Sequence, residues 1–287
     1  MMYKRRLETH NSRIISGILL AGEILLFITL IMISLFPMLW GALSSFKATN
    51  VLFSFPPKFI FKPTLEHYST VLRSGYFRVF LTTVLYCAAS VILGSVLALL
   101  AGYSFQRSKF RFKKILFFLV VAGIPLSIGS SALLIPNYLY FTNLGITNKW
   151  YTLIILFVGY TLPMGIWIVK GGIEGIPIEI EEAAKIDGCS NAYIIFRIIP
   201  ILNAPAMAAA MMFIFIGSWN EFIAVMVMVN SPNLRTLQVV IYSFLSFFGQ
   251  EWGPLTASTT ISVIPIFIVF TFLGKLLISG LTQGSVK

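Results

Sequence analysis

Long apolar runs alternate with short polar stretches along the whole chain. Residues 79–106, 115–148 and 150–169 contain no Asp, Glu, Lys or Arg. Because about 20 apolar residues in a helix cross a hydrocarbon core of about 30 Å, each of these runs is long enough to span a membrane. The pattern predicts six helical spans, at about residues 14–40, 79–102, 115–134, 150–169, 201–229 and 255–274.

The remaining polar residues form tails and loops around these spans. Residues 1–13 and 281–287 are expected to be tails of one transmembrane domain, residues 14–280. A short surface helix is expected near residues 65–72, and Pro125 is expected to kink the third span. Outer loops are predicted at residues 42–78, 137–149 and 230–254, and a tight basic loop, which serves as a topology signal, at residues 107–114.

Composition supports an all-α integral membrane protein. The 287 residues are 57% hydrophobic and 11% charged, with a mean hydropathy of +0.90. A soluble domain carries about 25% charged residues, so this chain could not cover its surface against water. Cys87 and Cys189 are expected at different depths, which argues against a disulfide, and the isolated His10 and His67 suggest no metal site.

The basic residues are distributed unevenly between the two sides of the predicted membrane domain. Of 21 Lys and Arg residues, 14 fall in residues 1–13, 103–114, 170–200 and 275–287. Because membrane proteins keep basic residues in cytoplasmic loops, the count predicts that both termini are cytoplasmic. The net charge of +11 is thinly spread between apolar spans, so a nucleic-acid partner is not expected.

Residues 174–205 depart from the apolar pattern. Five of the ten acidic residues lie within residues 174–187. Pro177 suits the first turn of a helix, where its missing N–H costs nothing, and carboxylates are favoured there by the helix dipole. Gly188 suits the left-handed position that ends a helix. These signals predict a short helix between Pro177 and Gly188.

A second helix is predicted directly after this turn. Ser190 suits its N-cap, and the helix is expected over residues 191–199 because proline at position 200 disfavours continuation. The result is a helix–turn–helix between the fourth and fifth spans. Its first helix is too short to be stable alone in water, so it is interpreted as a docking element for a groove on another protein.

The spacing in this segment resembles the EAA loop of ATP-binding-cassette (ABC) importer permeases. Residues 182–184 read Glu-Ala-Ala, three residues precede Gly188, and nine more precede Ile198. The family pattern ends in Ile-x-Leu-Pro, whereas here Pro200 comes one residue early and follows an isoleucine. That departure affects the exit of the second helix rather than the turn.

Further phrases resemble the carbohydrate subfamily of maltose-permease type, in particular the shorter second subunit of its permease pairs. They are residues 53–58 (Phe-Ser-Phe-Pro-Pro-Lys), 63–68 (Pro-Thr-Leu-Glu-His-Tyr), 219–222 (Trp-Asn-Glu-Phe) and 280–287 (Gly-Leu-Thr-Gln-Gly-Ser-Val-Lys). The likeness covers nearly the whole chain.

The resemblance implies a set of partners in a bacterial or archaeal cell membrane. These are a second homologous permease subunit, two cytoplasmic ATPase subunits that bind ATP and Mg, an extracytoplasmic solute-binding protein and a sugar substrate. The chain has no GxxxxGK[ST] phosphate loop and no expected catalytic residue, so it is not expected to be an enzyme. The residues implied to couple to the ATPase are Glu181, Glu182, Ala183, Ala184, Lys185, Asp187 and Gly188.

Residues Trp219, Asn220 and Glu221 are candidates for the substrate path, because aromatic rings stack on sugars and amides bind hydroxyl groups. A packed tryptophan and a helix-bonded asparagine explain the first two equally well. Glu221, like Glu23, is an ionisable group within a span and is either a proton carrier or a structural residue that is paired or wetted.

Two alternative functions follow from these features. One is a permease of the same superfamily for a solute other than a sugar. The other is a self-contained secondary transporter that uses Glu23 or Glu221 as a proton relay. Six spans without an evident inverted repeat argue against the second alternative.

Overall fold

The computed structural model describes residues 2–125, 131–246 and 249–283, and helices make up most of this part. The helices are α1 (Met2–Ser44), α2 (Thr49–Leu52), α3 (Glu66–Arg73), α4 (Tyr76–Arg107), α5 (Lys113–Ala122), α7 (Ser131–Asn143), α8 (Trp150–Glu174), α9 (Ile178–Ile186), α10 (Asn191–Tyr193), α11 (Ile199–Leu202), α12 (Ala204–Asn220), α13 (Ile223–Met228), α14 (Leu237–Ser243) and α15 (Trp252–Gln283). A π-helix, η1 (Ile194–Ile198), a 3₁₀ turn, η2 (Pro232–Leu234), and a small antiparallel hairpin, β1 (Leu245–Ser246) with β2 (Gly249–Gln250), complete the described elements.

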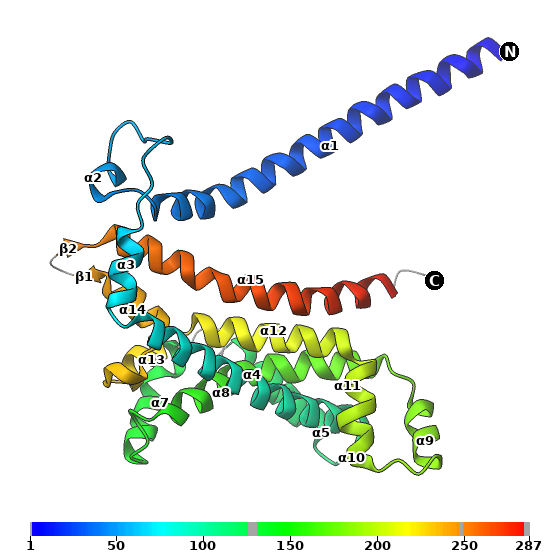
Figure 1. Ribbon diagram of the computed structural model, residues 1–287. Helices are drawn as coiled ribbons and strands as arrows, with labels where there is room; N and C mark the ends of the chain where they lie inside the picture. The colour runs from blue at the N-terminus through cyan, green and yellow to red at the C-terminus, as the bar shows by residue number, and fades with distance from the viewer. Residues whose placement is uncertain (1, 126–130, 247–248, 284–287) are drawn as a thin grey trace.

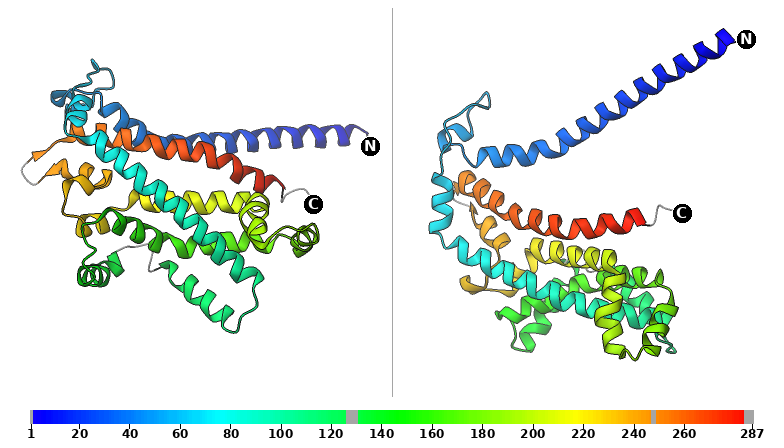
Figure 2. Two further views of the ribbon diagram at one scale, coloured as in Figure 1. Left: turned by 60° about the horizontal axis from the view of Figure 1, so that its bottom comes forward. Right: turned by 45° about the vertical axis from the view of Figure 1, so that its right-hand side comes forward.

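Helices α4, α8 and α12 form the centre of the molecule, α15 lies against α12, and α1 projects away from the others (Figure 1, Figure 2). Small residues let the central helices approach closely. A Cβ atom placed on Gly165 of α8 would lie 3.3 Å from the Cβ of Ala98 on α4. Such small-residue contacts are typical of helix pairs in membranes, where burial of apolar surface does not drive association.

Four helices within the described residues are long and apolar enough to cross a membrane, and a bent pair raises the number to five. The four are Leu19–Ser44, Tyr76–Arg107, Trp150–Glu174 and Trp252–Leu277. They fall on the first, second, fourth and sixth predicted spans. The predominantly helical architecture, with several apolar helices, fits an integral membrane protein.

The third predicted span is not one continuous helix. Helix α5 ends at Ala122 and Gly123 forms a turn, after which residues 124–125 are helical again and residues 126–130 lie outside the described part. The prediction that residues 137–149 form a loop is also wrong in its first half, because α7 continues through Pro136 to Asn143. Packing outweighs the proline here, since Phe141 is buried against α8 and α13.

The fifth predicted span is broken in two places. The helical segment Asn191–Leu202 meets α12 at an angle of 88°, with Asn203 between them. At its other end α12 stops at Asn220, because Glu221 has an extended backbone with ψ of 117° before α13 begins. A single helix over residues 201–229 is therefore a wrong prediction.

The elements separate into two ends of the molecule. The beginning of α1, the end of α15 and helices α9 to α11 point to the same side of the molecule, which we call the α9 end, although α1 projects away from the other helices (Figure 1). Helices α2, α3, α13 and α14 and the hairpin lie at the opposite α3 end, in all views (Figure 2). Helix α4 joins the two ends, and at the α3 end its Tyr76 hydroxyl donates a hydrogen bond of 2.6 Å to the Ser258 carbonyl of α15.

Candidate functional site

Helix α9 ends in the turn that the sequence predicts at Gly188. The residue has a φ of +83°, a left-handed conformation in which a side chain would be strained. The Cys189 N–H donates to the Ala184 carbonyl at 2.9 Å, and the Gly188 N–H donates to the Lys185 carbonyl at 3.0 Å. This pair of bonds satisfies the last carbonyls of the helix and fixes the direction in which the chain leaves it.

The second helix of this segment begins as predicted but continues further. The Ser190 hydroxyl caps it by accepting a hydrogen bond from the Tyr193 N–H at 3.2 Å. The prediction that it stops before Pro200 is wrong, because it passes through η1 and ends at Leu202. Pro200 cannot donate an N–H to the preceding turn, and the wider π-helical turn η1 directly before it accommodates the proline within the continuous helix.

A buried corner joins this second helix to α12. Asn203 is 3% exposed, and its side-chain amide donates to the Val169 carbonyl of α8 at 3.1 Å. Gly172 leaves the space for it, since a Cβ atom there would lie 1.9 Å from the Asn203 Oδ1 atom and 2.5 Å from the Ala206 Cβ. The bend of 88° is therefore held against α8 by one side chain and one glycine.

The residues expected to couple to an ATPase lie on two different faces of α9. Glu181 and Ala184, three positions apart, are buried against the rest of the chain. The residues that are exposed are Glu182, Ala183, Lys185, Asp187 and Gly188. Ile186, which is 87% exposed, adds an apolar side chain to this outer face. Helix α9 thus offers a partner small, charged and apolar groups while its inner face is anchored.

Glu181 is the strongest anchor of the inner face. Its side chain is almost fully buried, and the Arg107 Nε atom at the end of α4 lies 2.6 Å from its Oε1 atom. The Tyr103 hydroxyl donates to its Oε2 atom at 2.8 Å, and Arg107 also donates to the Ile176 carbonyl at 2.6 Å. Both carboxylate oxygens are therefore satisfied by α4, and one arginine holds two points of the loop.

Sequence reasoning did not identify Tyr103 and Arg107 as part of this site. Arg107 was interpreted with its basic neighbours as a signal of topology. A further signal is available in their spacing, because residues four positions apart on a helix share a face, and these two polar groups lie at the end of α4, where its uncharged run over residues 79–106 stops. The pairing with Glu181 could not be inferred, because it joins segments more than 70 residues apart.

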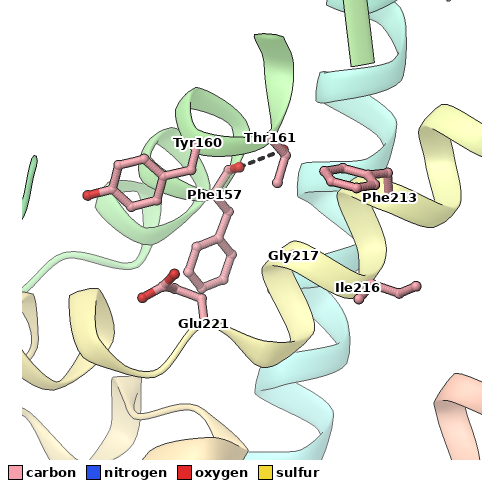
Figure 3. A pocket seen from close by; sticks show the side chains of 7 residues that line it. All are labelled: Phe157, Tyr160, Thr161, Phe213, Ile216, Gly217 and Glu221. Atoms are coloured by element: carbon pink, nitrogen blue, oxygen red, sulfur yellow. Dashed lines mark hydrogen bonds between the residues drawn. The ribbon is translucent and has the colours of Figure 1, made fainter. Parts of the chain in front are cut away.

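A second candidate site is a cavity of about 160 Å³ between α8 and α12 (Figure 3). Seven residues line it: Phe157, Tyr160, Thr161, Phe213, Ile216, Gly217 and Glu221. The wall combines aromatic rings with one carboxylate and hydroxyl groups. Aromatic faces and hydrogen-bonding groups of this kind suit a small polar organic molecule that also has apolar faces.

Glu221 lies where α12 stops, at one side of this cavity (Figure 3). It is partly buried, and its Oε1 atom accepts a hydrogen bond from the Ala224 N–H at 2.9 Å. This bond caps the first turn of α13. Neither of the two ion pairs found in the described part of the chain involves Glu221. Its carboxylate thus has one structural bond and one oxygen left for other contacts.

The other two candidates for the substrate path do not join Glu221 at the cavity. Trp219 is 1% exposed and packs between Phe80 and Phe215, with ring centroids 6.2 and 5.5 Å away. Asn220 is exposed outside the cavity lining. Trp219 therefore belongs to the core. The lining residues Tyr160 and Thr161 were missed, although they are adjacent polar groups within an apolar span.

Glu23, the other ionisable residue in a predicted span, lies on the exposed surface of α1. It takes part in neither ion pair of the described residues and does not line the cavity beside Glu221. The two glutamates are on different helices, and α1 projects away from α12 (Figure 1). Glu23 and Glu221 therefore lie in separate parts of the described structure.

Comparison with known families gives a match over most of the chain. Residues 90–283 match the model of a family described as "Binding-protein-dependent transport system inner membrane component". The match includes both candidate sites, from Tyr103 on α4 through α9 to Glu221.

Several curated proteins are similar over nearly their whole length. A putative ABC transporter permease protein, ORF2, of Caldicellulosiruptor sp. is 33% identical over 88% of this chain and 91% of its own. The trehalose/maltose transport system permease protein MalG of Thermococcus litoralis is 32% identical over 94% and 96%. The diacetylchitobiose uptake system permease protein DasC of Streptomyces coelicolor is 31% identical over 92% and 94%.

One solved structure has a similar fold. It is a chain from the crystal structure of a bacterial ABC transporter involved in the import of the acidic polysaccharide alginate. The TM-score is 0.74 at 20% sequence identity, over 91% of this chain and 96% of that chain. At this identity the likeness concerns the fold.

Proposed function

The chain belongs to the family of inner membrane components of binding-protein-dependent ABC transport systems, and we propose that it forms half of a translocation pathway for a sugar or oligosaccharide. In this proposal separate ATPase subunits hydrolyse ATP, and the chain transmits their movement through α9. The chain itself carries out no chemical reaction.

The observation that supports coupling most directly is the form of α9. It is a short helix between α8 and α12 with one anchored face and one exposed face. A short helix of this kind suits a groove on a partner protein. We propose that Glu182, Ala183, Lys185 and Asp187 enter that groove. Gly188 then turns the chain away from it. Glu181 and Ala184 hold the helix from behind rather than contacting the ATPase.

The proposal of a sugar substrate is supported by similar proteins and by the cavity. Relatives named for trehalose/maltose, diacetylchitobiose and maltodextrin transport share 31–32% of their residues with this chain. The cavity beside Glu221 offers aromatic faces and hydrogen-bonding groups, which suit sugar rings and hydroxyls. We therefore assign Glu221, Tyr160 and Thr161 to the substrate path and leave Trp219 to the core.

The proposed assembly contains a second homologous permease subunit, two ATPase subunits and an extracytoplasmic solute-binding protein. The α9 end would face the cytoplasm, with both chain termini on the same side. Support comes from the position of α1's beginning, α15's end and α9 at one end of the molecule (Figure 1). ATP would supply the free-energy difference between inward- and outward-facing states.

Reconstitution tests this proposal. The chain, its partner permease and the ATPases are placed in liposomes, and uptake of labelled maltose, trehalose and diacetylchitobiose is measured with the binding protein and ATP. Gly188→Val should lower uptake at least about tenfold, because a β-branched residue resists the left-handed conformation. The matched variant Gly188→Asn should retain most uptake, since asparagine adopts that conformation more readily.

The outcomes separate the candidate functions. Uptake that requires ATP and the binding protein, and that Gly188→Val abolishes, supports the proposal. ATP-dependent uptake of another solute class would leave coupling intact and remove the sugar assignment. Uptake without ATPase subunits, abolished by a protonophore and by Glu221→Gln, would favour the proton-coupled alternative instead.

A further inference from the structure

Helix α9 makes few side-chain contacts with the membrane helices. It lies at the edge of the α9 end, between the connections formed by residues 175–177 and 187–190 (Figure 1). Its outer face is exposed, and its inner face offers only Ala184 and Glu181 as buried groups. Ala184 contacts an apolar cluster, but its methyl group makes no directional bond. Apart from the short chain connections at its two ends, α9 is therefore linked to the membrane helices by a small number of side-chain contacts.

Among the described residues, the side-chain hydrogen bonds from α9 to the membrane helices run to α4. Arg107 and Tyr103 bind separate oxygens of Glu181 at 2.6 and 2.8 Å. The Arg107 side chain is 12% exposed and the Glu181 side chain 3%, so water screens the pair weakly. Arg107 also donates to the Ile176 carbonyl, just before α9 begins. Two adjoining points of the segment are thus tied to one helix end.

Helix α4 extends from this anchor to the opposite end of the molecule. It packs along α8 and α12, the two helices that form the cavity (Figure 2). At the α3 end its Tyr76 hydroxyl binds the Ser258 carbonyl, and its Thr83 hydroxyl accepts from the Leu237 N–H at 2.9 Å. A movement of its Arg107 end is therefore transmitted to both walls of the cavity and to α15.

We propose that Glu181 is a positioning residue through which α9 moves α4, with Arg107 and Tyr103 as its receiving groups. This inference rests on the proposed function, because it assigns the internal route of a coupling that α9 begins. In this route the Arg107–Glu181 ion pair joins α9 to α4. Because the pair is buried, it is expected to stay formed while α9 shifts. The exposed Glu182 next to it faces the partner, whereas Glu181 faces the membrane helices.

Two fluorescent probes test the route in the assembled transporter. Only ATP and vanadate are added as ligands. One probe is attached to α4 at Ser104→Cys, which is exposed, and the other, in a separate protein, to α9 at Glu179→Cys. The partly buried Cys189 is replaced by alanine to avoid labelling it, and Cys87 is buried. Both probes should respond to ATP and vanadate in the parent protein.

Glu181→Ala should reduce the response of the α4 probe at least about fivefold while the α9 probe responds as before. Glu181→Gln, which keeps one acceptor oxygen but replaces the other with an NH2 donor and removes the charge, should give an intermediate response. The matched control Glu179→Gln removes an exposed carboxylate from the same helix and should leave the α4 response unchanged.

Other outcomes have distinct meanings. An α4 response in Glu181→Ala equal to that of the parent protein overturns the inference, and so does a silent α4 probe when the α9 probe of the parent responds. If neither Glu181→Ala nor Glu181→Gln assembles while Glu179→Gln does, the residue is structural only and the inference is overturned. A silent α9 probe in the parent protein would instead overturn the proposed function.

Discussion

The two candidate sites each contain a glutamate, and the surroundings of these glutamates differ. At the α9 end, Glu181 is 2% exposed and receives bonds from a cation, a hydroxyl and no backbone N–H. Beside the cavity, Glu221 is partly exposed, has no ion-pair partner among the described residues and accepts one backbone N–H. Both carboxylate oxygens of Glu181 accept bonds from the chain, whereas only one oxygen of Glu221 does so among the described residues.

This difference shows how the same side chain serves two purposes. A buried carboxylate with a cation fixes the relative position of two segments, because separating the charges is costly. A carboxylate at a helix break, with a free oxygen beside a cavity, can bind a polar group from outside the chain. The α9 end therefore contains a fixed internal connection, whereas the carboxylate beside the cavity keeps one oxygen without a partner among the described residues.

The largest effect is expected from removing one partner of the buried pair. Arg107→Met leaves the Glu181 charge without its cation and should lower the free energy of unfolding by about 3 kcal/mol. The double variant Arg107→Met with Glu181→Leu should recover most of this loss, because apolar residues need no compensating charge. Thermal unfolding in detergent measures both, and a double variant less stable than Arg107→Met would contradict the explanation.

A smaller effect is expected at the corner between the two sites. Gly172→Ala places a methyl group 1.9 Å from Asn203 and should destabilise the protein by about 1–3 kcal/mol through overpacking. Gly171→Ala, where nothing lies within 4 Å of the added atom, is the matched control. Equal melting temperatures for the two variants would show that the corner relaxes freely, and the two sites would then be structurally independent.

At the cavity the expected change concerns binding more than stability. Glu221→Gln keeps an oxygen for the Ala224 N–H and should change stability little, while Glu221→Leu removes the cap at a cost of about 1 kcal/mol. Both should raise the KM for sugar uptake severalfold, because each loses the carboxylate. Unchanged uptake kinetics in both variants would remove Glu221 from the substrate path.

The smallest effect is expected from the second ion pair, Lys170 with Glu174, at 2.6 Å. Like the Arg107–Glu181 pair, it joins a basic side chain to a glutamate at 2.6 Å, but the Glu174 side chain is 62% exposed. Water and salt screen such pairs, so Glu174→Gln should leave the melting temperature unchanged within error. A loss of stability as large as that of Arg107→Met would show that burial does not explain why the two ion pairs differ in their contribution to stability.

Local signals in the sequence predicted the parts of the site that depend on neighbouring residues. The left-handed turn at Gly188 and the cap at Ser190 are examples, because each satisfies backbone groups within one turn of itself. The helix over residues 65–72 corresponds to α3 for the same reason. The all-helical character of the chain followed from composition and apolar run length.

The parts that the sequence did not predict depend on contacts between distant segments. Which face of α9 turns inward depends on Arg107 at the end of another helix, so Glu181 was grouped with the exposed Glu182. Trp219 was considered for the substrate path, but Phe80 and Phe215 enclose it. The bend at Asn203 requires the space left by Gly172, which no local pattern reports.

The corner at Asn203 has a mechanical consequence. The arm Asn191–Leu202 is about 18 Å long and α12, with 17 residues, about 25 Å, and the arms meet at 88°. If this corner turns as one rigid lever, about 1 Å of travel at Asn191 becomes about 1.4 Å at Glu221 by the ratio of these lengths. The direction also changes, because travel along the axis of α12 at the short arm becomes sideways travel at the long one. Such a lever would widen or narrow the cavity by moving α12 relative to α8, with both helices keeping their length.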